Sequence, residues 1–360
     1  MEQKMQQQDE QLLAHLQIHL TDWHLARQKF LVLFILALAK AQTVCFTRIA
    51  PYLSNVQISS NHRRIQRFFA EFNIDFTIIA QIIWALLPEK PSYKLSLDRT
   101  NWQFAGIDFN ILMLSIITSH GMSIPILWQT LPKFGNSNQQ ERIDLVAEYI
   151  RLFGKNTIEH IVADREFIGQ NWFGYLIENH IKFFIRTREN TWCYQRGKGY
   201  IKAFWLFYNL PLNTLKQYHS PFLIKNQWVY ISGIKQLSQK GQFEYVIILS
   251  YAFDAQTFKN YSQRWQIECL FKALKSSGFN IESTHLKDAQ RLDKLLALVA
   301  ITFVWVLKIG LWKNQQKNIP IKTHKRLAQS IFRYGLDALN HAFEFDFNTL
   351  ISFINLLSCT

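Results

Sequence analysis

Strand-like runs of residues follow one another in the middle of the chain and constrain the fold class. Between Tyr93 and Leu131, turn residues separate the runs YKLSLDRTNW, FNILMLSIITSHG and SIPILWQTL, which predicts an antiparallel meander. A helix over Gln139–Leu152 comes next, then the apolar run HIVADREF, a helix near Gly169–Asn179 and the run IKFFIRTREN. Strands that alternate with helices usually pair in parallel. We therefore expect a mixed α/β sheet with a meander at one edge and parallel strands beyond it.

The segments on either side of these strands predict the domain organisation. Residues 1–90 are typical of helices, and so are residues 280–360, which include an apolar core helix at 295–307. Residues 191–242 are aromatic, basic and rich in turn residues, as in a small β-rich insertion, and FEYVIILSYAF then returns as a strand. The expected parts are a helical N-terminal region (1–90), a core (91–190 and 243–310), an insertion (191–242) and a helical C-terminal region (311–360).

The charge of the chain indicates a polyanionic partner. Lys and Arg outnumber Asp and Glu by 40 to 26, which gives a net charge of +14. Nucleic acid is favoured over an acidic membrane, because the most apolar runs, Phe30–Ala39 and Leu295–Leu307, lie between lysines. Both runs are shorter than the roughly 20 residues that a membrane span needs. We therefore expect two buried core helices and no membrane partner.

The cysteines and the N-terminus favour the cytoplasm. Four cysteines lie far apart without a CxxC pair, which argues against a zinc site or a disulfide framework and fits a reducing compartment. The N-terminus, MEQKMQQQDEQ, is polar and rich in Gln, unlike a signal peptide.

A basic helix in the N-terminal region is a candidate DNA-binding element. In ISSNHRRIQRFFAEF, Ser59 or Ser60 could cap a helix on which Arg63, Arg64 and Arg67 share one face. Phe68 and Phe69 would anchor the opposite face. Two interpretations stay open: a solvated surface, or a helix lying against DNA phosphates, which would make residues 1–90 a DNA-binding region.

Four polar residues near residue 270 fall on one stripe of a predicted helix. If YSQRWQIECLFKALKSSGF is one helix, Tyr261, Arg264, Glu268 and Lys275 lie within an arc of roughly 60°. This stripe borders the apolar face formed by Ile267, Leu270, Phe271 and Leu274. An ordinary ion pair explains Arg264 and Glu268 taken alone but not the other two residues.

Two further carboxylates interrupt or end apolar strands. Asp98 lies within YKLSLDRTNW, and Asp164 lies at the end of the run HIVADREF, where it could also be a simple helix cap. On adjacent strands the two charges would repel, and divalent cations would relieve that repulsion. With Glu268 added, the three acids could hold two Mg²⁺ ions about 3.5–4 Å apart, or Mn²⁺ in their place, for phosphodiester displacement. Arg264 and Lys275 would bind flanking phosphates, and Tyr261 could donate a hydrogen bond to one.

These residues resemble a known family. The spacing Tyr-x2-Arg-x3-Glu-x6-Lys, formed here by Tyr261, Arg264, Glu268 and Lys275, is similar to the signature of DDE transposases of bacterial insertion sequences. The family named after insertion sequence four is the nearest in motif. LSLDRTNW and VADREF resemble its first and second Asp motifs, and GNSNQQERIDL lies between them as it does in that family. The similarity covers about residues 60 to 310.

The resemblance implies an RNase H-like core with a mixed five-stranded sheet, interrupted by a β-rich insertion and flanked by helical regions. It implies an Asp-Asp-Glu triad at Asp98, Asp164 and Glu268 and cut-and-paste transposition through a DNA hairpin. The implied partners are terminal inverted repeats and target DNA, bound by a homodimer in a synaptic complex on DNA in the bacterial cytoplasm. A Trp of the insertion stacks on a flipped base in some members, and Trp192, Trp205 and Trp228 are the candidates here. No motif selects among them, and we expect each to be a core residue instead.

Two other functions compete with an active transposase. One is a transposon-derived DNA-binding regulator that does not cut, which would have no need of three converging acids. The other is an RNase H-like nuclease without strand transfer, which would not require the helical N-terminal region or the Tyr-Arg-Lys stripe.

Overall fold

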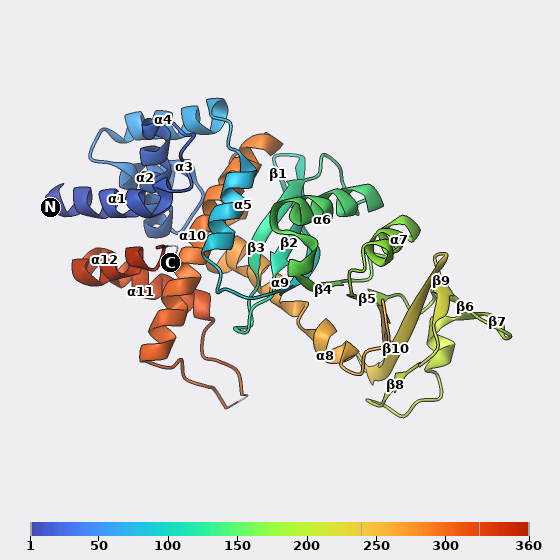
Figure 1. Cartoon of the computed structure of the whole chain (residues 1–360). Coiled ribbons are helices and arrows are strands. Elements are labelled where there is room, and N and C mark those ends of the chain that lie inside the picture. The colour runs from blue at the N-terminus through green and yellow to red at the C-terminus, as the bar shows by residue number, and fades with distance from the viewer. Residues whose placement is uncertain (1, 239, 324, 359–360) are drawn as a thin grey trace. The chain divides into compact units, whose positions relative to one another are not determined.

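The computed structural model describes residues 2–238, 240–323 and 325–358 (Figure 1). The chain forms two compact units. Unit 1 contains Met1–Glu89, Asn101–Phe109 and Leu270–Thr360, and unit 2 contains Lys90–Thr100 and Asn110–Cys269. The division between the units falls at residue 269, within the segment that the sequence assigns to the core.

A mixed sheet of eleven strands organises unit 2. Its order is β3-β2-β1-β4-β5-β11-β10-β9-β6-β7, with β8 paired to β10. The strands are β1 (Tyr93–Phe104), β2 (Ile107–Ile116), β3 (Ile124–Thr130), β4 (Ile158–Ala163), β5 (Phe183–Thr187), β6 (Trp192–Gln195), β7 (Gly199–Lys202), β8 (Leu215–Gln217), β9 (Phe222–Ile224), β10 (Gln227–Leu237) and β11 (Phe243–Ser250). The end of β1 and the start of β2 belong to unit 1.

The predicted pairing of the first five strands is confirmed. β2 and β3 pair in antiparallel orientation, whereas β1–β4 and β4–β5 are parallel. The two crossovers contain α6 (Gln139–Phe153) and α7 (Gln170–Glu178), both close to the expected helices. Asn138 and Glu141 form a capping box that fixes the start of α6. The mixed sheet with its helices agrees with the RNase H-like α/β fold that the resemblance implies, although the sheet has eleven strands where five were expected.

The insertion extends the same sheet. β10 pairs with β11 from Tyr230↔Ser250 to Leu237↔Phe243, and β11 pairs with β5 of the core. The buried ring of Phe207 covers Gly233 of β10 so closely that a Cβ there would lie 2.6 Å from it. The small core of the insertion therefore packs on a strand that the main sheet holds in place.

Unit 1 is helical. Its helices are α1 (Glu2–Gln17), α2 (Leu25–Ala41), α3 (Phe46–Leu53), α4 (Ile58–Glu71), α5 (Phe76–Ala85), α10 (Ala289–Gln316), α11 (Ile331–Phe345) and α12 (Phe347–Asn355). Gly310 and Gly335 let α10 and α11 approach closely, since a Cβ at Gly335 would lie 2.0 Å from the carbonyl oxygen of Val306. Phe68 and Phe69 of α4 are buried as predicted. The predicted cap is wrong: α4 begins after Gln57, so Ser59 and Ser60 lie inside its first turn.

The central helix of unit 1 is longer than its sequence suggests. α10 has 28 residues and contains both Lys294 and Lys308. Lys294 does not interrupt the buried face of the helix, because it is itself buried and its Nζ donates a hydrogen bond to Phe69 O over 3.3 Å. Within the described residues, α10 is long and apolar enough to cross a membrane, and there would be up to three such spans if two sharply bent helix pairs were counted. In this structure 83% of that apolar stretch is buried inside the protein. The prediction that this apolar run is too short to cross a membrane is therefore wrong for α10. The prediction that it forms a buried core helix is confirmed.

The segment that was predicted as one helix over residues 261–279 is broken. α8 (Thr257–Ser262) ends before Gln263, α9 (Trp265–Lys272) follows a turn, and Ala273–Ser277 forms a π-helical segment. A turn and a wider π coil both shift the angular phase of later side chains. The 60° stripe calculated for a single straight helix is therefore wrong, and the positions of its four residues must be taken from the structure.

Candidate active site

The two predicted aspartates lie side by side at the centre of the sheet. β1 and β4 are parallel neighbours, and their ladder pairs Leu97 with Ala163. Asp98 directly follows Leu97, and Asp164 directly follows Ala163. The register of the two strands therefore brings the two acids together. Asp164 also raises the pKa of Asp98 by charge repulsion, as a close neighbour would. The central prediction from the sequence, an acid pair on adjacent strands, agrees with this geometry.

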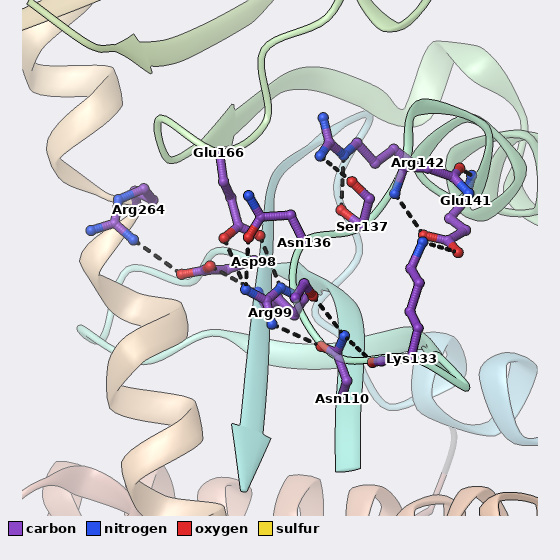
Figure 2. A network of polar contacts seen from close by, with 12 residues as sticks. Asp98, Arg99, Asn110, Lys133, Asn136, Ser137, Glu141, Arg142, Glu166 and Arg264 are labelled. Atoms are coloured by element: carbon purple, nitrogen blue, oxygen red, sulfur yellow. Dashed lines mark hydrogen bonds and ion pairs between the residues drawn. The ribbon is translucent and has the colours of Figure 1, made fainter. Parts of the chain in front are cut away.

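Arg264 connects Glu268 to Asp98 by ion pairs. Arg264 lies in the turn between α8 and α9, and its Nη1 is 3.1 Å from Asp98 Oδ2. Its Nη2 is 2.5 Å from Glu268 Oε1. The Arg264 and Asp98 side chains are largely buried, whereas Glu268 is 45% exposed. One guanidinium therefore bridges the first and third predicted acids (Figure 2 shows its contact with Asp98).

Tyr261 lies beside the Arg264 guanidinium. Its ring packs against the buried cluster of Ile117, Val162, Phe184 and Ile248, and the Arg264 guanidinium lies 5.9 Å from the ring centre. Burial raises the pKa of Tyr261 to about 12. At neutral pH the phenol therefore keeps its proton and can donate a hydrogen bond.

Lys275 belongs to unit 1 and lies in the π-helical segment. Its Nζ donates to Asn101 O over 2.8 Å, pairs with Glu282 at 2.9 Å and lies 5.6 Å from the centre of the Trp102 ring. The predicted phosphate contact of Lys275 stays a prediction.

The basic residues of α4 have different surroundings. Arg63 and Arg67 are exposed, whereas Arg64 is half-buried and lies 5.6 Å from the centre of the Phe30 ring. Burial lowers the pKa of Arg64. The three side chains are therefore not equivalent, and their predicted contact with DNA stays a prediction.

A polar network that the sequence did not reveal connects the two segments that carry Asp98 and Asp164 (Figure 2). Arg99 binds both carboxylate oxygens of Glu166, with Nε–Oε1 at 3.1 Å and Nη2–Oε2 at 3.2 Å. Its other bonds go to Asn110 Oδ1 at 2.9 Å and Asn136 Oδ1 at 3.1 Å. Since Arg99 follows Asp98 and Glu166 lies two residues after Asp164, this forked ion pair ties the two acid-bearing segments together. The available signal was the charged neighbour next to each acid, in LDR and DRE.

A buried arginine, Arg142, packs against the segment that carries Asp164 and Glu166. Arg142 of α6 is 3% exposed, donates to Ser137 Oγ over 2.8 Å and lies 4.9 Å from the centre of the Phe167 ring. Burial lowers its pKa to about 10, so it remains charged at neutral pH. It thereby holds the loop that carries Asp164 and Glu166 against α6.

Burial dominates the electrostatics of Asp98. Loss of water around its carboxylate raises its pKa to about 7, while the backbone N–H of Arg99 and the charge of Arg264 oppose this shift and Glu166 and Asp164 add to it. Near neutral pH this acid thus lies close to the midpoint of its titration.

Asp98 makes the stability of the protein depend on pH in a defined direction. Its carboxyl ionises near 3.8 in the unfolded chain and near 7 in the fold. Its contribution to stability is therefore fully present below pH 3.8 and is lost as the pH rises through 7. In metal-free protein, the free energy of unfolding of Asp98→Asn should rise relative to wild type by roughly 2–4 kcal/mol between pH 4.5 and pH 8. Urea unfolding in EDTA measures this difference. Asp144→Asn, on the exposed face of α6, is the matched control, and parallel curves for wild type and Asp98→Asn would contradict the assignment.

The donor set suits a divalent cation. Asp164 Oδ1 is buried and has no hydrogen-bond partner among the described residues, which is costly unless another group satisfies it. Carboxylate oxygens are the ligands that Mg²⁺ and Mn²⁺ prefer. As the side chains stand, however, no three His, Cys, Asp or Glu residues in the described part of the chain form a group that could hold an ion. The physical reason at Asp98 and Glu268 is the Arg264 guanidinium, which binds both of them.

The tryptophans of the insertion are exposed. Trp192, Trp205 and Trp228 are 58%, 52% and 37% exposed, so their interpretation as core residues is wrong. Lys202 Nζ lies 5.6 Å from the centre of the Trp192 ring, and the Arg196 guanidinium lies 4.9 Å from that of Trp228. Trp192 and Trp228 are therefore aromatic surfaces with a cation beside them, whereas the ring of Trp205 packs at tilted angles against Phe204 and Tyr208.

Comparison with known families agrees with this geometry. The family described as the transposase DDE domain matches residues 89–305, which is more than half of the chain. The chain therefore belongs to the DDE transposase family, whose members cleave DNA and generally use divalent metal ions.

The other comparisons add little. No curated protein matches the sequence. Among solved structures, an endonuclease V of Bacillus subtilis is similar to this chain at 11% identity and a TM-score of 0.24, over 70% of this chain and 98% of that one. At that TM-score the likeness carries no argument.

Proposed function

We propose that this chain is the transposase of a bacterial insertion sequence, of the family named after insertion sequence four, and that it excises and inserts its element by cut-and-paste chemistry. The observation that carries the proposal is the register of β1 and β4, which sets Asp98 beside Asp164, together with the link from Asp98 through Arg264 to Glu268. Two more residues of the Tyr-Arg-Glu-Lys spacing lie at these acids: Arg264 binds Asp98 and Glu268, and Tyr261 lies beside the Arg264 guanidinium. This arrangement favours the insertion-sequence-four family over other families with three acids.

Each residue has a role in the proposed reaction. Asp98, Asp164 and Glu268 would hold two Mg²⁺ ions, or Mn²⁺ in their place. When bound, such ions stabilise the attacking and leaving oxygens of a phosphodiester displacement. Arg264 pairs with a phosphate oxygen through its forked guanidinium. Tyr261 donates a hydrogen bond from its protonated phenol, and the pair of Arg99 and Glu166 keeps the aspartates in register.

The proposed substrates are the terminal inverted repeats of the element and its target DNA. A homodimer in a synaptic complex would cut each end through a hairpin and then join it to the target in the bacterial cytoplasm. A non-cutting regulator is disfavoured because nothing in simple DNA binding requires an acid whose buried Oδ1 has no partner among the described residues. A plain nuclease is disfavoured by Tyr261 and Arg264 beside the acids.

The test is an end-cleavage assay on linear duplexes that carry the DNA flanking the gene. We expect Mg²⁺-dependent nicking at the element boundary, then a hairpin on the released end, then joining to a second duplex, all resolved on denaturing gels. Nicking without hairpins or joined products would favour the nuclease. Specific binding of the ends without any cut would favour the regulator.

A further inference from the structure

Unit 1 contains an open cleft that has no part in the proposed chemistry. It lies between α3, α4 and the segment that leads into α10, and its volume is about 500 Å³. We call it the α3–α4 cleft. Its lining residues are Val44, Cys45, Phe46, Thr47, His62, Gln66, Arg67, Phe69, Ala70, Thr284, His285, Leu286 and Arg291.

The walls of the α3–α4 cleft are mostly apolar and aromatic. Phe46 is half-buried and stacks on the buried ring of Phe69, with ring centres 4.9 Å apart and planes 22° apart. Val44 and Leu286 add aliphatic surface. An aromatic pair at the side of an open cleft of this size suits a flat, apolar ring system.

The charged residues that line the cleft are arginines. Arg67 and Arg291 are exposed, and within the described residues neither guanidinium has a hydrogen-bond or ion-pair partner. His62 and His285 also line the cleft, and no Asp or Glu does. Arg67 also borders a neighbouring cleft, which it shares with Arg64 and Glu71, whereas Arg291 lines the α3–α4 cleft. The cleft beside Arg186 differs, since Glu189 and Glu244 line it. The ligand that fits is therefore anionic as well as flat.

We propose that the α3–α4 cleft binds one unpaired nucleotide of bound DNA. The base would stack on Phe46, and its flanking phosphates would pair with Arg67 and Arg291. The Gln66 amide and the Thr47 hydroxyl line the same cleft and supply donors and acceptors for a base edge. The inference rests on the proposed function only in that the chain must bind DNA.

The shape of the cleft favours an unpaired nucleotide over a duplex backbone. A duplex presents a continuous row of phosphates, which proteins bind with several Lys and Arg side chains. The α3–α4 cleft offers two arginines and a mostly apolar wall, which does not suit such a row. An unpaired base exposes both of its faces and can leave water for an aromatic surface, as in single-strand binding sites.

The experiment compares a duplex that carries one unpaired 2-aminopurine nucleotide with the same duplex fully paired. Fluorescence anisotropy gives both affinities, and 2-aminopurine emission reports whether the base is stacked. We expect wild-type protein to prefer the bulged duplex by about tenfold. Phe46→Leu and Arg291→Gln should each bring this ratio close to one. Lys287→Gln is the matched control, because it removes a charge from the same segment but does not line the cleft.

Each outcome is decisive. Equal affinity of wild type for the two duplexes overturns the inference and leaves the proposed function intact. Failure to bind either duplex overturns both. A preference for the bulge that survives Arg291→Gln in well-folded protein places the unpaired nucleotide elsewhere and overturns the inference, and this variant is informative even if Phe46→Leu unfolds. Tight binding of free deoxynucleoside monophosphate that does not compete with the bulged duplex also overturns it.

Discussion

Asp164→Asn is expected to lower Mg²⁺-dependent cleavage of the element end by roughly a thousandfold or more, with end binding almost unchanged. The substitution keeps the size of the side chain but removes the charge from a carboxylate whose buried Oδ1 has no partner among the described residues. Asp98→Ala and Glu268→Ala should have the same effect. Single-turnover cleavage and anisotropy on one labelled duplex measure the two quantities together.

The matched control for this prediction is Asp144→Asn. Asp144 is an exposed acid of unit 2 whose carboxylate accepts a hydrogen bond from Gln140 within α6, so cleavage should stay within about twofold of wild type. If Asp98→Ala protein still cuts the end at a wild-type rate, the triad assignment is wrong. If all three variants lose binding as well as cleavage, the acids stabilise the fold and their catalytic role is unsupported.

Arg264→Ala is expected to raise the affinity of the DNA-free protein for Mn²⁺ and to lower cleavage by about a hundredfold. The guanidinium now neutralises Asp98 and Glu268, so any cation that binds these carboxylates competes with it. Its removal leaves two carboxylates without their counter-charge and therefore strengthens the attraction for a divalent ion. The loss of cleavage has a separate cause, which is the missing contact with a DNA phosphate.

Isothermal titration with Mn²⁺ in the absence of DNA measures the first effect, and single-turnover cleavage at saturating Mn²⁺ measures the second. Arg151→Ala is the matched control, since Arg151 forms an exposed ion pair with Glu148 on α6. An unchanged Mn²⁺ affinity would show that Arg264 does not compete for these acids. Cleavage that recovers fully at high Mn²⁺ would contradict its role at the phosphate.

The sheet of the core could be predicted from sequence because its signals are local. Strand runs separated by turns predict the meander, and alternation with helices predicts the parallel strands. The capping residues Asn138 and Glu141 mark the start of α6. The juxtaposition of Asp98 and Asp164 is only a hypothesis at the level of sequence, because the sequence does not specify which strands are neighbours. The parallel register of β1 and β4 supplies that information.

Other features depend on packing that no local pattern contains. The turn at Gln263 and the π-helical segment around Lys275 follow a sequence that is continuously compatible with a helix. The forked ion pair of Arg99 and Glu166 joins residues 67 positions apart, so no local pattern indicates it. The length of α10 was underestimated because Lys294 is buried in this fold, although lysine is rarely found there.

The pairing of β10 along the whole length of β11 has a consequence for any shortened form of the protein. β11 pairs on one side with β5 of the core and on its other side with β10 of the insertion. Deletion of residues 191–242 would turn β11 into an exposed edge strand whose backbone N–H and C=O groups have no hydrogen-bond partner on that side. Such edge strands pair with strands of other chains. A truncated protein should thus be aggregation-prone before its chemistry can be examined, so the insertion is better probed by point substitutions than by deletion.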